Sequence, residues 1–394
     1  MILGGLRRVF TGVIVTVLIL ALISPVLYQV FIKSSRPLNI AIVDKTVTVF
    51  DAEARTYPEH YSMFWILNHE KIQPTRSGPH APDRNSNGRY DIDHDYFGYY
   101  PPADKLTGVL DIDLRSIDLL YLADAYGLLE YLPNGTVRRR AGGYSVEEAN
   151  AIAEYARSGG SIIAEWNTLG YPTYLNRTAL EILESVFHVR TYGYGKHYPD
   201  LANVEKFYKE MYREVTGREW RFIGEGIMII QEFVVGSYPK QEKVEFIILE
   251  RTDLQTGVFP MFLHVRNDHP AFEGADSLIP YAYWFEIAIP TLDAKVLGEY
   301  EIKTTNSGRE KLARHGLKPM MTAMITYDGY YRHIYYAGDF ADYAPNYPPF
   351  LLSYIAGIGS VMRLLPTLPW DGFFWRFYYP TFMKAVKWVT GRGT

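Results

Sequence analysis

Apolar residues form one long uninterrupted run near the start of the chain. Residues 9–32 carry no charge, and basic residues flank them at Arg7-Arg8 and Lys33. A helix of this length rises roughly 36 Å, which exceeds the hydrocarbon thickness of about 30 Å of a bilayer. The run predicts a transmembrane helix, and we assign residues 1–35 to an uncleaved single-pass anchor. The slightly larger positive charge before the run predicts a cell-membrane protein whose body is extracytoplasmic.

Shorter apolar runs, each bounded by polar residues, predict buried strands at 38–44, 117–124 and 161–165. Between the second and the third, a Ser–Glu capping box begins an amphipathic helix at 145–157, and a Gly–Gly pair ends it. Strand, helix and strand in this order form a βαβ unit, which crosses over right-handed in a parallel sheet. The pattern predicts a three-layer α/β domain with a mostly parallel sheet over residues 36–394.

The second half of the chain continues these patterns. We predict helices at 179–187, 204–215 and 375–389, strands at 227–235 and 244–249, and a hairpin of 320–327 with 332–340. Residues 348–375 form an apolar and aromatic segment whose unbroken part, 350–362, is too short to span a bilayer. For this segment we expect contact with a bilayer or with a membrane protein, and a place in the core is the alternative.

Composition removes several classes of function. The 394 residues include no cysteine, which excludes disulfides, thiolate nucleophiles and cysteine-bound metals. The net charge of −4 and the pI near 6.2 argue against a nucleic-acid partner. The absence of cysteine also favours an extracytoplasmic location, because such chains are common among exported proteins.

One polar loop has the spacing of a calcium-binding loop, within an irregular insertion at 74–100. Oxygen-bearing side chains occupy its first, third, fifth and ninth places, and glycine the sixth: Asp83, Asn85, Asn87, Asp91 and Gly88. The twelfth place holds His94 in place of the usual glutamate, so Asp93 or Asp95 has to complete the site. The loop predicts a weak Ca²⁺ site, and a turn rich in Asn and Asp is the alternative.

Acidic side chains end several of the predicted strands. In open α/β sheets, ligands bind outside the carboxyl ends of the strands, so these positions are candidate ligand contacts. The candidates are Asp44, Asp124, Glu165 and Asp339, with Tyr126 and Asn167 beside them. If the carboxylates converge, their like charges raise some pKa values and make a general acid or part of a cation site. The alternative is that they cap helices or contact water.

The order of these elements resembles the class I glutamine amidotransferase-like fold. The similarity rests on the segments DLLYLADAYG, GGSIIAEWNTLG, YYAGDFAD and AVKWVTG, and covers about residues 37–394. The nearest likeness is to the membrane-anchored bacterial branches that have lost the catalytic residues. The resemblance places the catalytic cysteine on the turn after 161–165 and the histidine after the strand at 333–337. This sequence has Glu165-Trp166-Asn167-Thr168 and Gly338-Asp339-Phe340 at those places, so thiolate chemistry is excluded.

Two classes of function remain after these exclusions. The first is a membrane-anchored, non-catalytic module that binds a ligand or a protein partner in a cell-envelope or transport assembly. The second is a carboxylate-dependent hydrolase, acting on a glycan with Glu165 or Asp124 and Asp339. Loss of the nucleophile of the parent fold favours binding over catalysis.

Overall fold

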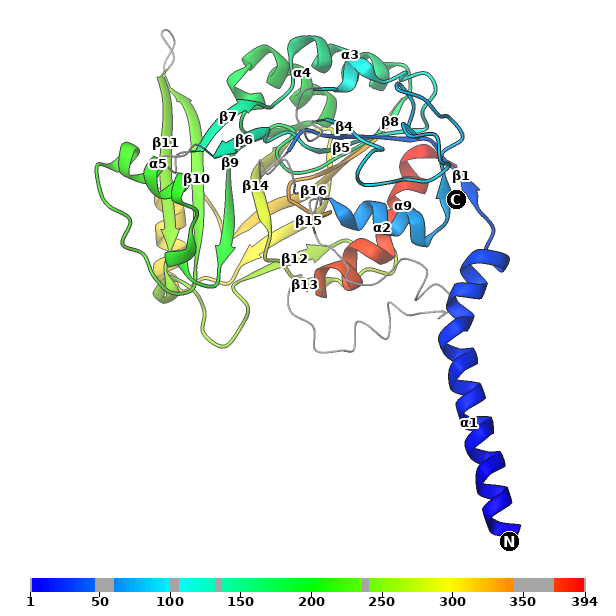
Figure 1. The fold of residues 1–394 in the computed structure, drawn as a ribbon. Helices are drawn as coiled ribbons and strands as arrows, with labels where there is room; N and C mark the ends of the chain where they lie inside the picture. The colour runs from blue at the N-terminus through cyan, green and yellow to red at the C-terminus, as the bar shows by residue number, and fades with distance from the viewer. Residues whose placement is uncertain are drawn as a thin grey trace.

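The computed structural model describes residues 2–46, 60–98, 106–131, 137–235, 241–342 and 372–392. The chain begins with α1 (Ile2–Leu27) and a π-helical turn, η1 (Tyr28–Ile32). Helix α1 extends away from the body of the molecule, and its apolar side chains from Phe10 onward are largely exposed (Figure 1).

The structure corrects the prediction of a transmembrane helix at 9–32. Within the described ranges, no helix combines the length and the apolar character needed to cross a membrane. The α-helix ends at Leu27, inside the predicted span, and the turn that follows is attached to the body. Buried Gln29 donates from Nε2 to the backbone oxygens of Asn68 and His69, at 3.0 and 3.3 Å.

A 13-stranded sheet forms the centre of the body, and one half of it is parallel. The parallel strands lie in the order β17 (Arg332–Tyr336), β8 (Ser161–Ala164), β5 (Leu119–Asp124), β2 (Ile40–Asp44) and β4 (Phe97–Gly98). Numbered along the chain, this is the order 2-1-3-4-5 of flavodoxin-like doubly wound sheets. Strand order reverses between β2 and β5, which makes their carboxyl ends the switch point of the sheet.

The other half of the sheet is antiparallel, so the prediction of a mostly parallel sheet is wrong. Its strands are β9 (Val189–Tyr198), β10 (Gly226–Val235), β11 (Gln241–Leu249), β12 (Met261–Val265), β13 (Leu278–Pro280), β14 (Trp284–Pro290), β15 (Lys295–Ile302) and β16 (Met320–Asp328). Strand β17 joins the halves, because it pairs antiparallel with β16 and parallel with β8. After β8 the chain returns mainly through hairpins, which produce antiparallel neighbours. The molecule is an α/β protein with a large mixed sheet.

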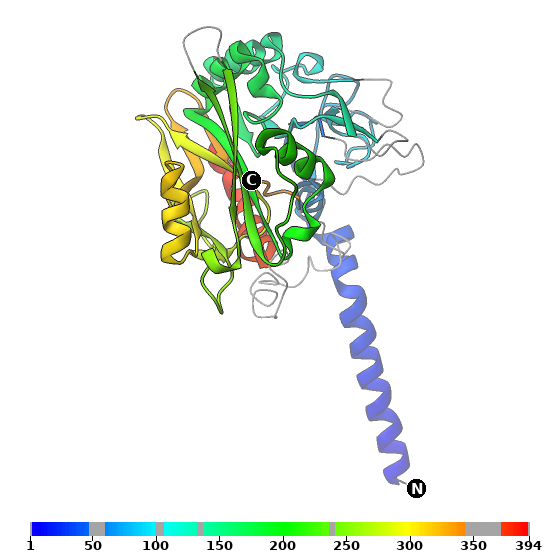
Figure 2. The same cartoon turned by 90° about the vertical axis from the view of Figure 1, so that its left-hand side faces the viewer.

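Helices cover both faces of the parallel half. Helices α2 (Tyr61–His69) and α9 (Tyr379–Thr390) pack on one face, and α3 (Val146–Arg157) and α4 (Arg177–Phe187) on the other. We call the antiparallel half of the sheet, β9 to β16, the antiparallel wing. Helix α5 (Lys206–Thr216) lies against it, at the side that faces the viewer in Figure 2, and α6 (Asn306–Arg314) contacts β11. The two small sheets pair β1 (Arg36–Pro37) with β3 (Ile72–Gln73) and β6 (Leu128–Tyr131) with β7 (Val137–Ala141). Short 3₁₀ or π turns are η2 (Val109–Asp111), η3 (Thr173–Leu175), η4 (Leu201–Asn203), η5 (Arg251–Asp253) and η6 (Phe374–Tyr378).

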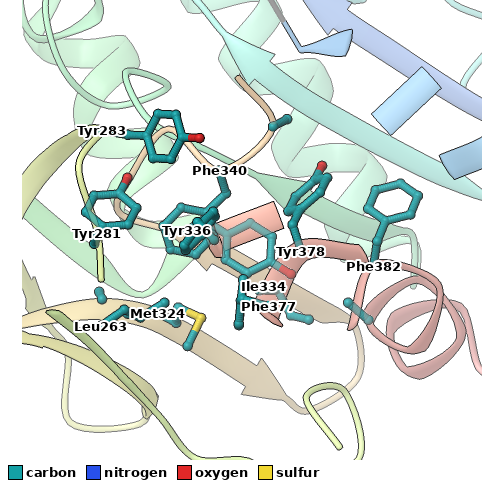
Figure 3. Packing of buried hydrophobic residues seen from close by; sticks show 14 of the residues in the cluster. Leu263, Tyr281, Tyr283, Met324, Ile334, Tyr336, Phe340, Phe377, Tyr378 and Phe382 are labelled. Atoms are coloured by element: carbon teal, nitrogen blue, oxygen red, sulfur yellow. The ribbon is translucent and has the colours of Figure 1, made fainter. Parts of the chain in front are cut away.

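The face under α2 and α9 is filled by aromatic rings. Phe340, which follows β17, lies among Tyr336, Tyr281 and Phe377, with ring centroids 4.8, 5.6 and 5.3 Å away (Figure 3). The segment predicted at 348–375 lies outside the described residues up to residue 371. Its described end, from residue 372, belongs to this core, because Phe373, Phe374 and Trp375 are buried.

Candidate functional site

Four acidic residues follow the parallel strands, at one edge of the sheet. Asp44 and Asp124 end β2 and β5 and are register partners, while Glu165 follows β8 and Asp339 follows β17. All four side chains are buried. The structure therefore brings the predicted strand-end carboxylates into one buried region.

His60 is the centre of this region. It precedes α2 in the left-handed conformation, with φ 57°, which histidine adopts more readily than most side chains. Its Nδ1 lies 3.0 Å from Oδ2 of Asp44, and its Nε2 lies 3.9 Å from Oδ1 of Asp339. Burial alone would lower the pKa of His60, but the negative charges of Asp44, Asp339 and Asp342 outweigh it and raise the pKa well above its ordinary value.

Asp339 and Asp342 lie on the loop that follows β17. Together with His60 they form a group whose potential metal-ligand atoms all lie within 4.8 Å of one another. The backbone N–H of Asp339 donates to the backbone oxygen of Trp284 at 3.1 Å. Burial and the charge of Asp342 hold the pKa of Asp339 well above its usual range.

Glu165 fixes this loop in place. Its Oε2 accepts the backbone N–H groups of Phe340 and Ala341, both at 3.0 Å. Its Oε1 accepts the hydroxyl groups of Tyr121 and Tyr378. Burial raises the pKa of Glu165 to about 7, although His60 and the two N–H groups lower it. Because both oxygens are engaged, Glu165 is placed to hold the loop and not to act on a ligand.

Asp124 has a different environment. Its Oδ1 accepts the backbone N–H of Tyr126 at 2.8 Å, which shapes the turn after β5. Burial raises the pKa of Asp124 to about 7; the positive charge of His60 opposes this shift and the negative charge of Asp44 adds to it. A carboxyl with this pKa is partly protonated near neutral pH, as a proton donor has to be.

Asn167 lies on the sharp turn after β8, with φ 64°. Its backbone N–H donates to Oε1 of Glu286 at 3.2 Å, and Tyr335 donates its hydroxyl to Oε2 of the same residue. Burial raises the pKa of Glu286 to about 8, against these hydrogen bonds. Glu286, on β14, is therefore a buried neighbour of Asn167 whose charge interacts with Asp124, although no sequence signal pointed to it.

The aromatic residues near the strand ends lie in two different environments. Trp166 is buried and stacks on Trp284, with ring centroids 5.5 Å apart. Tyr126 and Tyr171 are half-buried and lie 6.2 Å apart by their centroids. Trp166 is thus part of the core under the antiparallel wing.

A cavity of about 730 Å³ lies beside the switch point. It is lined at its floor by Lys45 and Glu148 and at its rim by leucines. The Nζ of Lys45 contacts both carboxylate oxygens of Glu148, at 2.6 and 2.7 Å, and the backbone oxygen of Gly143 at 3.1 Å. The cavity lining includes none of Asp124, Glu165 and Asp339.

The loop predicted to bind calcium is closed by its own hydrogen bonds. Asp83 accepts the backbone N–H groups of Asn87 and Gly88, and the side-chain amides of Asn85 and Asn87 donate to Asp91. Asp95 accepts the N–H groups of Arg84 and Asp91. In the described part of the chain, the acidic residues of this loop do not form a compact group of three ligands. Calcium binding by this loop stays a prediction.

Sequence reasoning missed His60, Asp342 and Glu286. Asp342 was visible in the motif YYAGDFAD, three residues after Asp339, as a second acid on the same loop. His60 carries no ligand spacing, because its partners are distant in the sequence. Its one signal is its place immediately before the apolar helical run at 61–69.

Comparison with known proteins gives weak structural likenesses and no match in sequence. No protein-family model matches the chain, and no curated protein matches it. Among solved structures, the chain is similar to a ThuA-like protein from Bacteroides uniformis, with 11% identity and a TM-score of 0.26 over 65% of this chain and 74% of that one. That protein is of the class I glutamine amidotransferase-like family. The fold assignment rests on the strand order described above and not on this likeness.

Proposed function

We propose that this chain is a binding module and not an enzyme, and that its ligand enters the cavity beside the carboxyl ends of β2 and β5. The observation that carries the proposal is the cavity of about 730 Å³ at the switch point of the sheet. Binding cavities commonly measure about 300–1,000 Å³, and doubly wound sheets bind ligands at this point.

The lining of the cavity is mixed, with polar side chains that include Asp111, and its most exposed apolar part is formed by three leucines. Leu106, Leu110 and Leu175 are 54%, 61% and 49% exposed around it. An ammonium group has three donors, and the contacts of Lys45 with Glu148 and Gly143 engage all three. The floor therefore offers little free charge to a charged ligand. We propose that the ligand is an apolar side chain on a segment of a partner protein.

Peptide selection on the purified chain tests this proposal. Peptides enriched from a random displayed library should carry an apolar anchor and should bind at least tenfold more weakly to Leu110→Arg and Leu175→Arg. Tenfold corresponds to about 1.4 kcal/mol, close to the lower end for burying one large apolar side chain. Leu292→Arg is the control, because Leu292 is fully exposed and does not line the cavity. Absence of enrichment, or enriched peptides that ignore the cavity variants, removes the proposal.

Carboxylate-dependent hydrolysis of a glycan is the second candidate. Asp124 favours it, because its pKa of about 7 leaves a proton donor at neutral pH. Glu165 is engaged on both oxygens, so Asp339 would have to serve as the second carboxylate. Aryl glycosides should be left intact by the wild type under the binding proposal. Hydrolysis that disappears in Asp124→Asn would establish the second candidate in its place.

A further inference from the structure

We propose that His60, Asp339 and Asp342 form a binding site for one divalent transition-metal cation, and that this cation is Zn²⁺. Their ligand atoms lie within 4.8 Å of one another and come from two separate segments of the chain. The proposal is independent of the function proposed above, because none of the three residues lines the leucine-rimmed cavity.

The orientation of His60 is the first argument. Its Nδ1 lies 3.0 Å from a carboxylate oxygen of Asp44, which fixes the proton of a neutral ring on Nδ1. When a cation binds, the ring releases the proton on Nε2 to solvent, and the lone pair of Nε2 then faces Asp339. Histidine ligands of metals usually donate their other N–H in this way to a carboxylate or a carbonyl. Asp44 is therefore the positioning residue of the site.

Two buried atoms in the group lack partners. Within the described ranges, neither Nε2 of His60 nor Oδ1 of Asp339 has a hydrogen-bond partner, although the two residues are only 1% and 5% exposed. Leaving such a buried atom unsatisfied destabilises the fold. Their separation of 3.9 Å is too long for a hydrogen bond. A tetrahedral cation at about 2 Å from each atom, the usual Zn–N and Zn–O distance, fits between them once the two side chains close by about half an ångström.

The surrounding structure holds the two segments together. The backbone N–H of Ser62 donates to the backbone oxygen of Ala341 at 3.3 Å, which joins the start of α2 to the loop after β17. Glu165 binds two successive N–H groups of that loop. Phe340 stands between the two aspartates in the sequence, and its ring is packed in the aromatic core against Tyr336 and Phe377 (Figure 3). The proposed ligands are thus preorganised by buried contacts on both sides.

The chemistry of the ligand set selects the metal. One imidazole and two carboxylates suit Zn²⁺, whereas Ca²⁺ and Mg²⁺ prefer sites made of oxygen alone. The two positive charges of the ion replace the proton that His60 releases and compensate Asp339 and Asp342. Three protein ligands leave a fourth position of a tetrahedral Zn²⁺ for water or for a ligand.

Titration of the metal-free full chain with Zn²⁺ tests the site, by calorimetry after chelation and dialysis. The wild type should bind one equivalent, and Asp342→Asn and His60→Gln should lose it over the concentrations that saturate the wild type. Asp44→Asn should keep the equivalent with an affinity 10–100-fold weaker, as expected for an outer partner of a ligating histidine. His315→Gln is the matched control, because its Nδ1 contacts Glu245 at 2.9 Å in a partly exposed pair elsewhere. Zinc binding by His315→Gln should equal that of the wild type.

The position of the ion is checked by diffraction at the zinc absorption edge. The anomalous peak should lie between Nε2 of His60 and the two carboxylates. Asp342 is only half-buried, so Asp342→Asn should fold even if His60→Gln does not. No binding by folded wild type, unchanged binding by Asp342→Asn, or a peak at another histidine each overturns the proposal. Saturation by Ca²⁺ with no response to Zn²⁺ overturns the choice of metal.

Discussion

Two buried histidines in the parallel half of the molecule have pKa values shifted in opposite directions. His60 is surrounded by Asp44, Asp339 and Asp342, and its pKa is raised well above the ordinary value. His333, on β17, is equally buried, but burial and the positive charge of nearby His188 lower its pKa to about 3. Burial by itself lowers the pKa of both rings. The difference shows that the charges around each ring, and not its depth, decide whether it attracts or repels positive charge.

The hydrogen-bond partners of the two rings differ as their pKa values do. His60 has a carboxylate at Nδ1, whereas neither ring nitrogen of His333 has a partner in the described part of the chain. His333 instead lies among rings, with the centroids of Phe187 and His188 both 5.7 Å away. His60 therefore lies in a polar site, while His333 behaves as a component of the core.

Removing the carboxylate of Asp44 should have the largest effect. We expect Asp44→Ala to lower the free energy of unfolding by about 3–5 kcal/mol, the usual penalty for leaving one member of a buried pair alone. Urea denaturation at neutral pH measures this loss. Asp44→Asn keeps a hydrogen-bond acceptor for His60 and should lose clearly less. If the free energy of unfolding of the alanine variant stays within about 1 kcal/mol of wild type, the contact between Asp44 and His60 does not account for the difference between His60 and His333.

The next largest effect should be the loss of stability at acid pH that comes from His333. The folded-state pKa of about 3 lies below the value of 6.5 expected for the unfolded chain, so His333 stays neutral in the fold. The contribution of neutral His333 to the free energy of unfolding is fully present above pH 6.5 and is lost as the pH falls from 6.5 toward 3. At pH 4.5 the loss is about 2–3 kcal/mol.

His333→Leu isolates that contribution. The variant removes the titrating ring and its two unpaired nitrogens, so its stability at pH 7 should equal or exceed that of wild type. Between pH 7 and 4.5, the wild type should lose about 2–3 kcal/mol relative to the variant, measured by parallel urea unfolding. Parallel pH profiles for the two proteins would show that the fold does not lower the pKa of His333.

An exposed histidine with a close carboxylate should contribute least to stability among the histidines compared. His264 contacts Glu301 at 2.6 Å, but its side chain is 40% exposed. We expect His264→Gln to change the free energy of unfolding by less than about 1 kcal/mol, because water screens such a pair. Thermal unfolding in low and high salt checks this. A loss as large as that of Asp44→Ala would show that contact distance, and not burial, sets the stabilisation.

The strand-end carboxylates could be predicted because local pattern was enough. An apolar run that ends in a charged residue marks both a buried strand and its exit, as at Asp44 and Asp124. The prediction of the parallel strands needed only this signal together with the rule for βαβ units.

Other features depended on contacts that a sequence does not display. The extent of the antiparallel wing follows from which strands pair, and short apolar runs leave the partner open. His60 and Asp342 meet only because α2 and the loop after β17 pack together. The apolar run at 9–32 predicted a membrane span, but it did not show that α1 ends at Leu27 and that Gln29 binds the body.

The central place of β17 has a consequence for how the molecule is made. Residues 332–336 are the only described link in the sheet between β8 and β16, yet they are synthesised after nearly all the other strands. Until they leave the ribosome, β8 and β16 each offer an unpaired row of backbone groups to other nascent chains. Closing the sheet there also joins contacts of very large sequence separation, which slows folding. We expect the production of this protein to depend strongly on chaperones that shield those strands during translation.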